Sequence, residues 1–207
     1  VCFFLIENED TSDWKKKFDI YDNIERKYIE YILKPNKPIL INGINIFKKI
    51  QNYINDYGTI KYYKTNCPSK KTLLNNENNN DVKYANVKSC YIENLTATIL
   101  YNYSNIKSKY CNKKPKLILP HKMYGFPYFD NKGIYGVSTR DNYIISGHDY
   151  SYKELEELQC FLSTKFALFI FSCCNYRMRF LERYSFEFLP CITKIPDFPI
   201  LKNNTRY

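Results

Sequence analysis

The residues best suited to chemistry lie in one stretch, residues 114–183, where basic, aromatic and amide side chains alternate. Lysine and arginine neutralise phosphates, arginine and asparagine pair with the edges of guanine and adenine, and tyrosine stacks on unpaired bases. The mixture therefore predicts recognition of a polynucleotide. The candidate DNA-binding residues are Lys116, His121, Lys122, Tyr124, Tyr128, Lys132, Tyr135, Ser138, Thr139, Arg140, Asn142, Arg177 and Arg179. The competing interpretation is a half-buried hairpin whose polar side meets water and whose tyrosines belong to the core.

Catalytic patterns are missing from the sequence. It contains no phosphate-binding Walker loop, no G-x-G-x-x-G and no H-E-x-x-H, and its two histidines are His121 and His148. A hydrolase could use one of them with Asp141 or Asp149 as the orienting carboxylate and a cysteine as nucleophile, but the spacing supports no triad. A nuclease would need a carboxylate cluster, and Asp197 after Pro196 has no E-x-K partner. We therefore expect binding, with neither catalytic residues nor a metal site in this chain.

The composition favours a polyanionic partner. The chain has 207 residues, a formal net charge of +10 and an aromatic content of 17%. Each cation that faces a phosphate releases condensed counterions, so a basic protein binds nucleic acid well at low salt. No run of 18 apolar residues occurs and the first residues lack a basic leader. We expect an intracellular protein without membrane contact, located in the cytoplasm, or in a viral factory or nucleoid if a virus encodes it.

The eight cysteines are scattered and include no C-x-x-C pair. Adjacent cysteines such as Cys173 and Cys174 rarely bind one structural metal. The spacing favours free and mostly buried thiols over a metal site or a disulfide framework.

The pattern of apolar residues predicts an α+β fold with a small mixed sheet, hairpins, one long buried helix and irregular connections. Apolar residues at helical spacing in residues 46–54 predict a short helix that ends at Gly58. Ser151 followed by Glu154 forms a capping box ahead of a long apolar face that runs to residue 170. Strands are expected in residues 90–104 and 114–120, and the turn at residues 130–133 predicts a hairpin.

Four motifs in the second half of the chain resemble the target recognition region of N6-adenine DNA methyltransferases from restriction-modification systems, including those of large DNA viruses. In that family a K-x-(I/L)-(I/L)-P strand leads to a G-x-Y-G-(V/L)-S hairpin end, an L-x-x-x-L-x-S-K helix and a final aromatic run. The matching segments are Lys116–Pro120, Gly133–Ser138, Leu158–Lys165 and Phe186–Pro190.

The resemblance implies a division of labour between this chain and a catalytic domain. The family's (N/D)-P-P-(Y/F) tetrapeptide and its glycine-rich cofactor loop are absent here. S-adenosylmethionine and the flipped adenine would therefore belong to a catalytic domain in the same or another chain, and the full-length parent would be an adenine-N6 DNA methyltransferase. This chain would bind double-stranded DNA, with Arg140 and Asn142 reading bases and with Lys116, Lys122 and Lys132 anchoring phosphates.

The resemblance also suggests a domain division. Residues 1–65 would be a strand and helix remnant beside the missing catalytic domain, residues 66–89 an exposed loop or connector, and residues 90–207 the DNA target recognition domain. Two other functions remain open. One is a structural or viral packing protein that binds nucleic acid without sequence choice, and the other is a restriction subunit with endonuclease activity.

Overall fold

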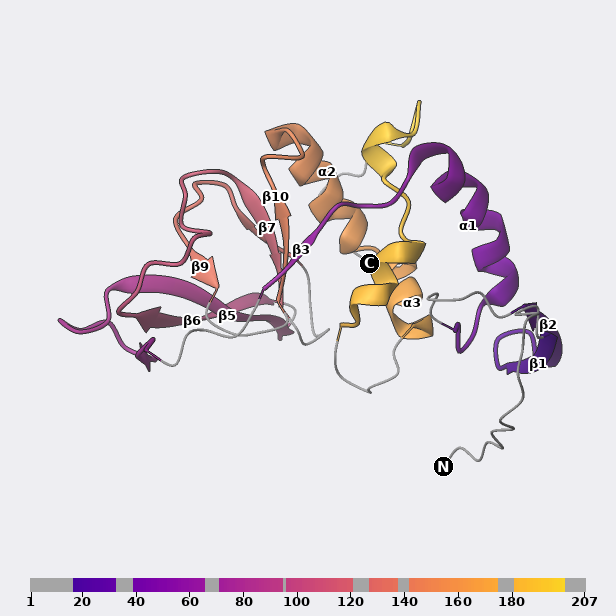
Figure 1. The fold of residues 1–207 in the computed structure, drawn as a ribbon, viewed down its shortest axis with the longest axis horizontal. Coiled ribbons are helices and arrows are strands. Elements are labelled where there is room, and N and C mark those ends of the chain that lie inside the picture. The colour runs from indigo at the N-terminus through magenta and orange to yellow at the C-terminus, as the bar shows by residue number, and fades with distance from the viewer. Residues whose placement is uncertain are drawn as a thin grey trace, which may run out of the picture.

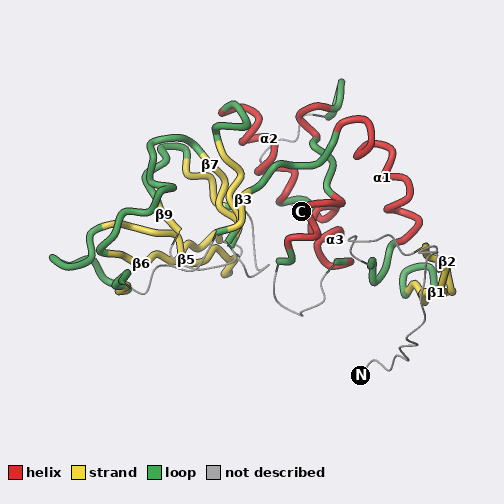
Figure 2. Tube along the Cα trace, in the orientation of Figure 1, coloured by secondary structure: helices red, strands yellow, loops and turns green. Residues whose placement is uncertain are grey.

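The structure is a computed structural model that describes residues 17–32, 39–65, 71–94, 96–120, 127–137, 142–174 and 181–199. Two small sheets gather at one end of the molecule and the helices at the other, with a separate two-stranded hairpin beside the first helix (Figures 1 and 2). The predicted α+β class is confirmed.

The helices and strands follow the chain in this order: β1 (Lys17–Asp22), β2 (Lys27–Ile32), α1 (Ile44–Tyr57), β3 (Tyr63–Lys64), β4 (Leu74–Asn75), β5 (Tyr84–Glu93), β6 (Thr96–Ser104), β7 (Lys116–Leu119), β8 (Tyr128–Asp130), β9 (Gly136–Val137), β10 (Tyr143–Ser146), α2 (Tyr152–Leu162), α3 (Lys165–Cys173), η1 (Arg183–Phe188) and η2 (Ile192–Lys194). The central sheet has the strand order β3-β10-β7-β8, and all of its pairings are antiparallel. The outer sheet has the order β4-β6-β5-β9, in which β9 pairs with β5 in parallel.

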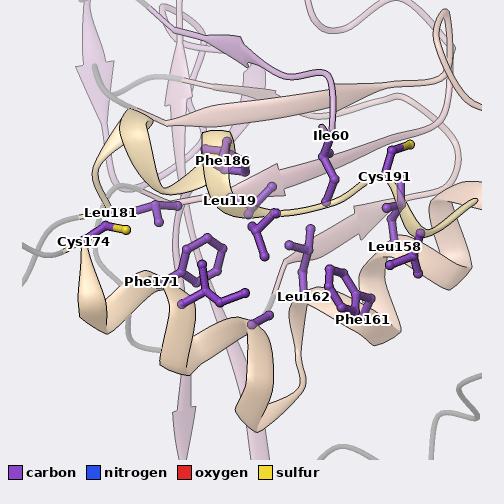
Figure 3. Close-up of a cluster of buried hydrophobic side chains, with 14 of the residues drawn as sticks. Ile60, Leu119, Leu158, Phe161, Leu162, Phe171, Cys174, Leu181, Phe186 and Cys191 are labelled. Atoms are coloured by element: carbon purple, nitrogen blue, oxygen red, sulfur yellow. The ribbon is translucent and has the colours of Figure 1, made fainter. Parts of the chain in front are cut away.

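The central sheet is covered on both faces. Because side chains alternate along a strand, Ile118 and Ile144 face the outer sheet and pack with Val87 and Cys90. The residues between them, such as Leu117 and Tyr143, belong to a larger core on the opposite face. Side chains from α2, α3, the central sheet and the C-terminal segment converge on that core (Figure 3).

The early part of the chain shares this larger core with the late part. Strand β3 pairs with β10, and the ring of Tyr62 stacks on that of Phe186 at a centroid distance of 4.3 Å. The rings of Phe47 in α1 and Phe188 in η1 meet edge to face at 4.9 Å. The described residues of 39–65 and of 117–198 therefore fold around one set of buried side chains. Within residues 66–89, β4 and the start of β5 already belong to the outer sheet.

The hairpin β1–β2 is joined to α1 by Asp22, which is fully buried. Its Oδ1 accepts hydrogen bonds from the backbone N–H groups of Ile24 and Glu25, and its Oδ2 accepts one from Ile44, at the start of α1. Burial opposes ionisation of this carboxyl, but the backbone donors outweigh it and lower its pKa. Since Gly43 offers no side chain to cap α1, the hairpin supplies the capping carboxylate.

The predicted short helix is confirmed as α1, which ends at Gly58 with φ of 74°. The predicted capping box is also present, because the Ser151 hydroxyl accepts from the Glu154 N–H and the Glu154 carboxylate accepts from the Ser151 N–H. The single long helix is interrupted, however. Residues 163–164 separate α2 from α3, and Thr164 caps α3 by accepting a hydrogen bond from the N–H of Ala167. The apolar pattern runs through the break because both helices pack on one core.

The predicted hairpin around residues 130–133 is wrong. Strand β8 pairs with β7, which precedes it, and the chain after the turn crosses to the outer sheet as β9. The turn itself exists, and its glycine, Gly133, has φ of 64°. It redirects the chain between sheets instead of folding it back along β8.

The prediction of free thiols is confirmed for the cysteines in the described residues. These are Cys90, Cys111, Cys160, Cys173, Cys174 and Cys191, and all are free and buried. Burial raises the pKa of Cys90 to about 12 and that of Cys173 to about 11, so neither is a ready nucleophile near neutral pH.

Candidate nucleic-acid interface

Three loops meet at one end of the central sheet. Strand β7 begins there at Lys116, and it pairs with Asp130 of β8 on one side and with Ser146 of β10 on the other. The preceding loop, residues 105–115, therefore lies between the loop at 131–135 and the turn at 147–149. The loops at 105–115 and 131–135 run alongside each other beyond the sheet (Figure 1).

Backbone hydrogen bonds hold these loops together. The N–H of Lys113 donates to the carbonyl of Gly133 at 3.1 Å, and the N–H of Gly147 donates to the carbonyl of Pro115 at 2.9 Å. The Cys111 thiol donates to the carbonyl of Ile134 at 3.1 Å. The loops therefore form a continuous surface.

This surface is strongly basic. Residues 105–115 contain four lysines and residues 131–136 a fifth, and neither segment contains an aspartate or glutamate. All five side chains are exposed. We call them the lysine-loop surface: Lys107, Lys109, Lys113, Lys114 and Lys132. Because β-strands lie about 4.8 Å apart, loops that leave neighbouring strands place such charges close together.

A buried ion pair at the ends of β7 and β8 holds the loop that carries Lys132. The Lys116 Nζ lies 2.5 Å from the Asp130 Oδ2, and the two side chains are 3% and 1% exposed. The Asp130 carboxylate also accepts hydrogen bonds from the backbone N–H groups of Ile134 and Tyr135, at 3.2 and 2.9 Å. The carboxylate thus fixes the 131–135 loop, and Lys116 compensates its charge.

Close approach at Gly133 fixes the loops further. A Cβ atom at this position would lie 2.3 Å from both the backbone N and O of Lys114. Only glycine permits this spacing together with a positive φ.

Burial removes two predicted residues from the surface. Lys116 was expected to anchor a phosphate, but its side chain is buried and its ammonium pairs with Asp130. Asn142 was expected to read a base, but it is 1% exposed, and its backbone bonds with Thr65 at 2.8 and 3.1 Å tie it to the chain after β3. Neither residue lies at the surface of this structure, because Lys116 begins a strand that is covered on both faces and Asn142 directly precedes another. Lys132 is exposed at the turn, as a phosphate anchor must be.

Two of the predicted tyrosines, Tyr128 and Tyr135, pack against the buried cluster between the two sheets. The ring of Tyr135 stacks on Tyr101 at 5.0 Å and meets Tyr128 edge to face at 5.7 Å. Burial is the main cause that raises the pKa of Tyr128, and its hydroxyl hydrogen-bonds with that of Tyr101. Tyr128 and Tyr135 are therefore half-buried, and their rings pack in the space between the sheets, which is the arrangement of the competing interpretation. The remaining predicted residues lie outside the described part of the chain: His121, Lys122, Tyr124, Ser138, Thr139, Arg140, Arg177 and Arg179.

Sequence reasoning missed four of the five exposed lysines, those in residues 105–115. The available signal was a segment of 11 residues with four lysines and no acid. In a chain with 31 basic residues this signal is weak. It becomes specific only when the fold brings the segment next to Lys132.

The turn after β10 adds a histidine to the edge of this surface. The Lys114 Nζ lies 3.1 Å from the His148 Nδ1, while the neighbouring Asp149 is engaged by the ammonium of Lys61. Burial opposes ionisation of Asp149, but its hydrogen bonds with Lys61 and Tyr63 lower its pKa overall. The Oδ1 of this carboxylate is therefore engaged by Lys61.

Comparison with protein-family models, with curated proteins and with solved structures finds no match for this chain. Among the described residues, no three His, Cys, Asp or Glu side chains come together as metal ligands. None of the helices in those residues has the length and hydropathy needed to cross a bilayer.

Proposed function

We propose that this chain binds double-stranded DNA through the lysine-loop surface and serves as the target recognition module of an adenine-N6 DNA methyltransferase. The observation that carries the DNA-binding part is the meeting of five exposed lysines on two adjoining loops that contain no acidic residue. The role in a methyltransferase is supported by the motifs of the second half of the chain. Methyl transfer and S-adenosylmethionine would belong to a separate catalytic domain.

The electrostatics of the surface support contact with phosphates. Asp130, directly before the 131–135 loop, is paired with Lys116, and Asp149, in the turn after β10, is paired with Lys61. Their negative charge is therefore compensated locally, and the two loops add five exposed lysines with no acidic residue. Lysine contacts phosphate as a point charge and carries no sequence information by itself.

A second candidate function is nucleic-acid binding without sequence choice, as in a packing protein. The burial of Asn142, a predicted base reader, favours it. The described surface supplies phosphate contacts, whereas a choice of sequence would depend on base contacts made in addition.

Selection from a library of duplexes with a randomised centre separates the two candidates. A target recognition module should enrich one short sequence and bind it about 10³-fold or more tightly than a scrambled duplex of equal length. Equal affinity for all duplexes would establish the second candidate. The same protein is titrated with anionic phosphatidylserine vesicles, and binding to vesicles without binding to any duplex would refute both.

A further inference from the structure

The outer sheet contains a long strand, β6, with an open edge. Strand β5 pairs with β6 along its length, from Thr96 to Ser104. On the other side of β6, the short strand β4 pairs with Tyr103 and Ser104. In the part of the chain that the structure describes, no further strand pairs with β6. The backbone groups of residues 96–102 that point away from β5 therefore have no sheet partner there.

This edge lacks the features that protect open strands from pairing with other chains. Proteins usually place charged residues, proline or a bulge on such a strand. Residues 96–102 read TATILYN and contain no charged residue, no proline and no glycine. The register irregularity of this hairpin lies on β5, between Val87 and Ser89. The composition of residues 96–102 is therefore that of a strand paired on both sides.

The same composition favours a second copy of the chain as the partner. A neutral strand can pair with itself in antiparallel orientation without placing like charges opposite each other. Strand β4 limits the pairing to residues 96–102, whose middle residue is Ile99. Ile99 packs against the buried cluster between the two sheets, so a second Ile99 beside it would extend this apolar layer.

We propose that β6 pairs in antiparallel orientation with β6 of a second copy, which joins the two outer sheets and gives a twofold dimer. The loop at 105–115 follows directly after Ser104, the last residue of β6. Ser104 lies five residues from Ile99, so ten residue steps separate the two Ser104 positions, about 34 Å at about 3.4 Å per residue. This distance is about one turn of B-DNA. The dimer thus starts its two 105–115 loops one helical turn apart, a consequence that rests on the proposed DNA binding.

Sedimentation velocity across micromolar concentrations measures the association state. We expect the mass of the full chain to rise to that of a dimer and then level off, because pairing consumes the open edge. Leu100 is 42% exposed and faces away from Ile99, so a charge can be placed there without entering the core. Leu100→Lys and Leu100→Glu should each remain monomeric, because the two side chains at position 100 lie diagonally across the interface. An equimolar mixture of the two variants should restore the dimer.

The matched control is Leu168→Glu. Leu168 is 37% exposed and lies on α3, at the helical end of the molecule (Figure 1). This variant should dimerise like the parent. A full chain that is monomeric at every concentration, or a mass that grows beyond the dimer, would overturn the proposal. Hydrogen exchange of the parent needs no variant: protection of amides in residues 96–102 should increase with concentration, and unchanged protection in a dimer would assign it to another surface.

Duplex length tests the spacing of the two loops. Fluorescence anisotropy compares duplexes of about 10 and about 24 base pairs, of which only the longer spans two sites one turn apart. We expect the longer duplex to bind about 100-fold more tightly, because the second contact is intramolecular. Leu100→Glu should lose this gain, and Leu168→Glu, with the same change of charge, should keep it. A dimer without the gain overturns the spacing, whereas a dimer that binds no duplex refutes the proposed function and leaves the β6 pairing standing.

Discussion

Replacing Lys113 and Lys114 by glutamine should weaken DNA binding and flatten its dependence on salt. The two lysines lie at the centre of the lysine-loop surface, where the backbone of Lys113 is bonded to that of Gly133. Glutamine keeps the length and polarity of the side chain but carries no charge. The replacement therefore tests the charge of the surface with little change in its shape.

The expected magnitude follows from counterion release. If each of the five exposed lysines neutralises one phosphate, the slope of log K against log salt concentration is about −4.5, and without two of them it is about −2.7. At 0.1 M salt the loss of two contacts corresponds to about 60-fold in affinity. The assay is a series of anisotropy titrations of a labelled duplex between 0.05 and 0.2 M NaCl, a range chosen because such slopes are well defined there.

The chain offers a control of identical composition. Lys48 and Lys49 are also adjacent and exposed, but they lie on α1, at the helical end of the molecule (Figure 1). Replacing both with glutamine changes the net charge equally. The reasoning is refuted if this control lowers the slope as much as the Lys113 and Lys114 replacement does, because general charge would then explain the binding.

Three further predictions concern stability. Asp22→Asn should destabilise the fold by about 1–3 kcal/mol, because an amide offers one acceptor oxygen to donors that now share two. Because the pKa of Asp22 is lowered in the folded state, its contribution to the free energy of unfolding is complete above about pH 4 and is lost as the pH falls through the pKa of the folded state. Urea titrations at pH 7 and pH 3 should therefore show a smaller difference in stability between variant and parent at pH 3. Lys116→Met should cost about 3–5 kcal/mol by leaving the carboxylate of Asp130 buried and unpaired, and the double replacement with Asp130→Asn should recover part of this in a urea-unfolding cycle. Gly133→Ala should lower the melting temperature more than Gly58→Ala, because both glycines have a positive φ but only at Gly133 would the added Cβ clash with a neighbouring backbone. Equal shifts in melting temperature would contradict this steric argument.

Local patterns predicted the elements whose stability is local. The helix α1 follows from apolar spacing and its terminal Gly58, and the start of α2 follows from the Ser151 capping box. The break between α2 and α3 also had a local sign, since Ser163 and Thr164 are typical of helix starts. It was hidden because both helices present apolar side chains to the same core, which keeps the periodicity continuous.

Non-local pairing decided the features that the sequence did not reveal. The turn at residues 130–133 looks like a hairpin, but β9 pairs with β5, which lies about 50 residues earlier in the chain. Lys116 and Asn142 look like surface residues, and they are buried because the outer sheet and the helices cover opposite faces of their strands. The lysines of residues 105–115 gain significance only because the pairing of β7 with β8 brings their loop beside the loop of Lys132.

The two-sided packing of the central sheet has a consequence for how the chain can be divided. A fragment that begins at residue 90 would lack β1, β2, α1, β3, β4 and the first six residues of β5. It would leave Tyr143 and Phe186 without the ring of Tyr62. Strand β10 would then become an edge with unsatisfied amide groups, open to pairing with another copy. Truncation at this point should therefore yield self-association in place of an autonomous binding unit, and any transplant of the lysine loops to another protein has to carry residues 39–65 along.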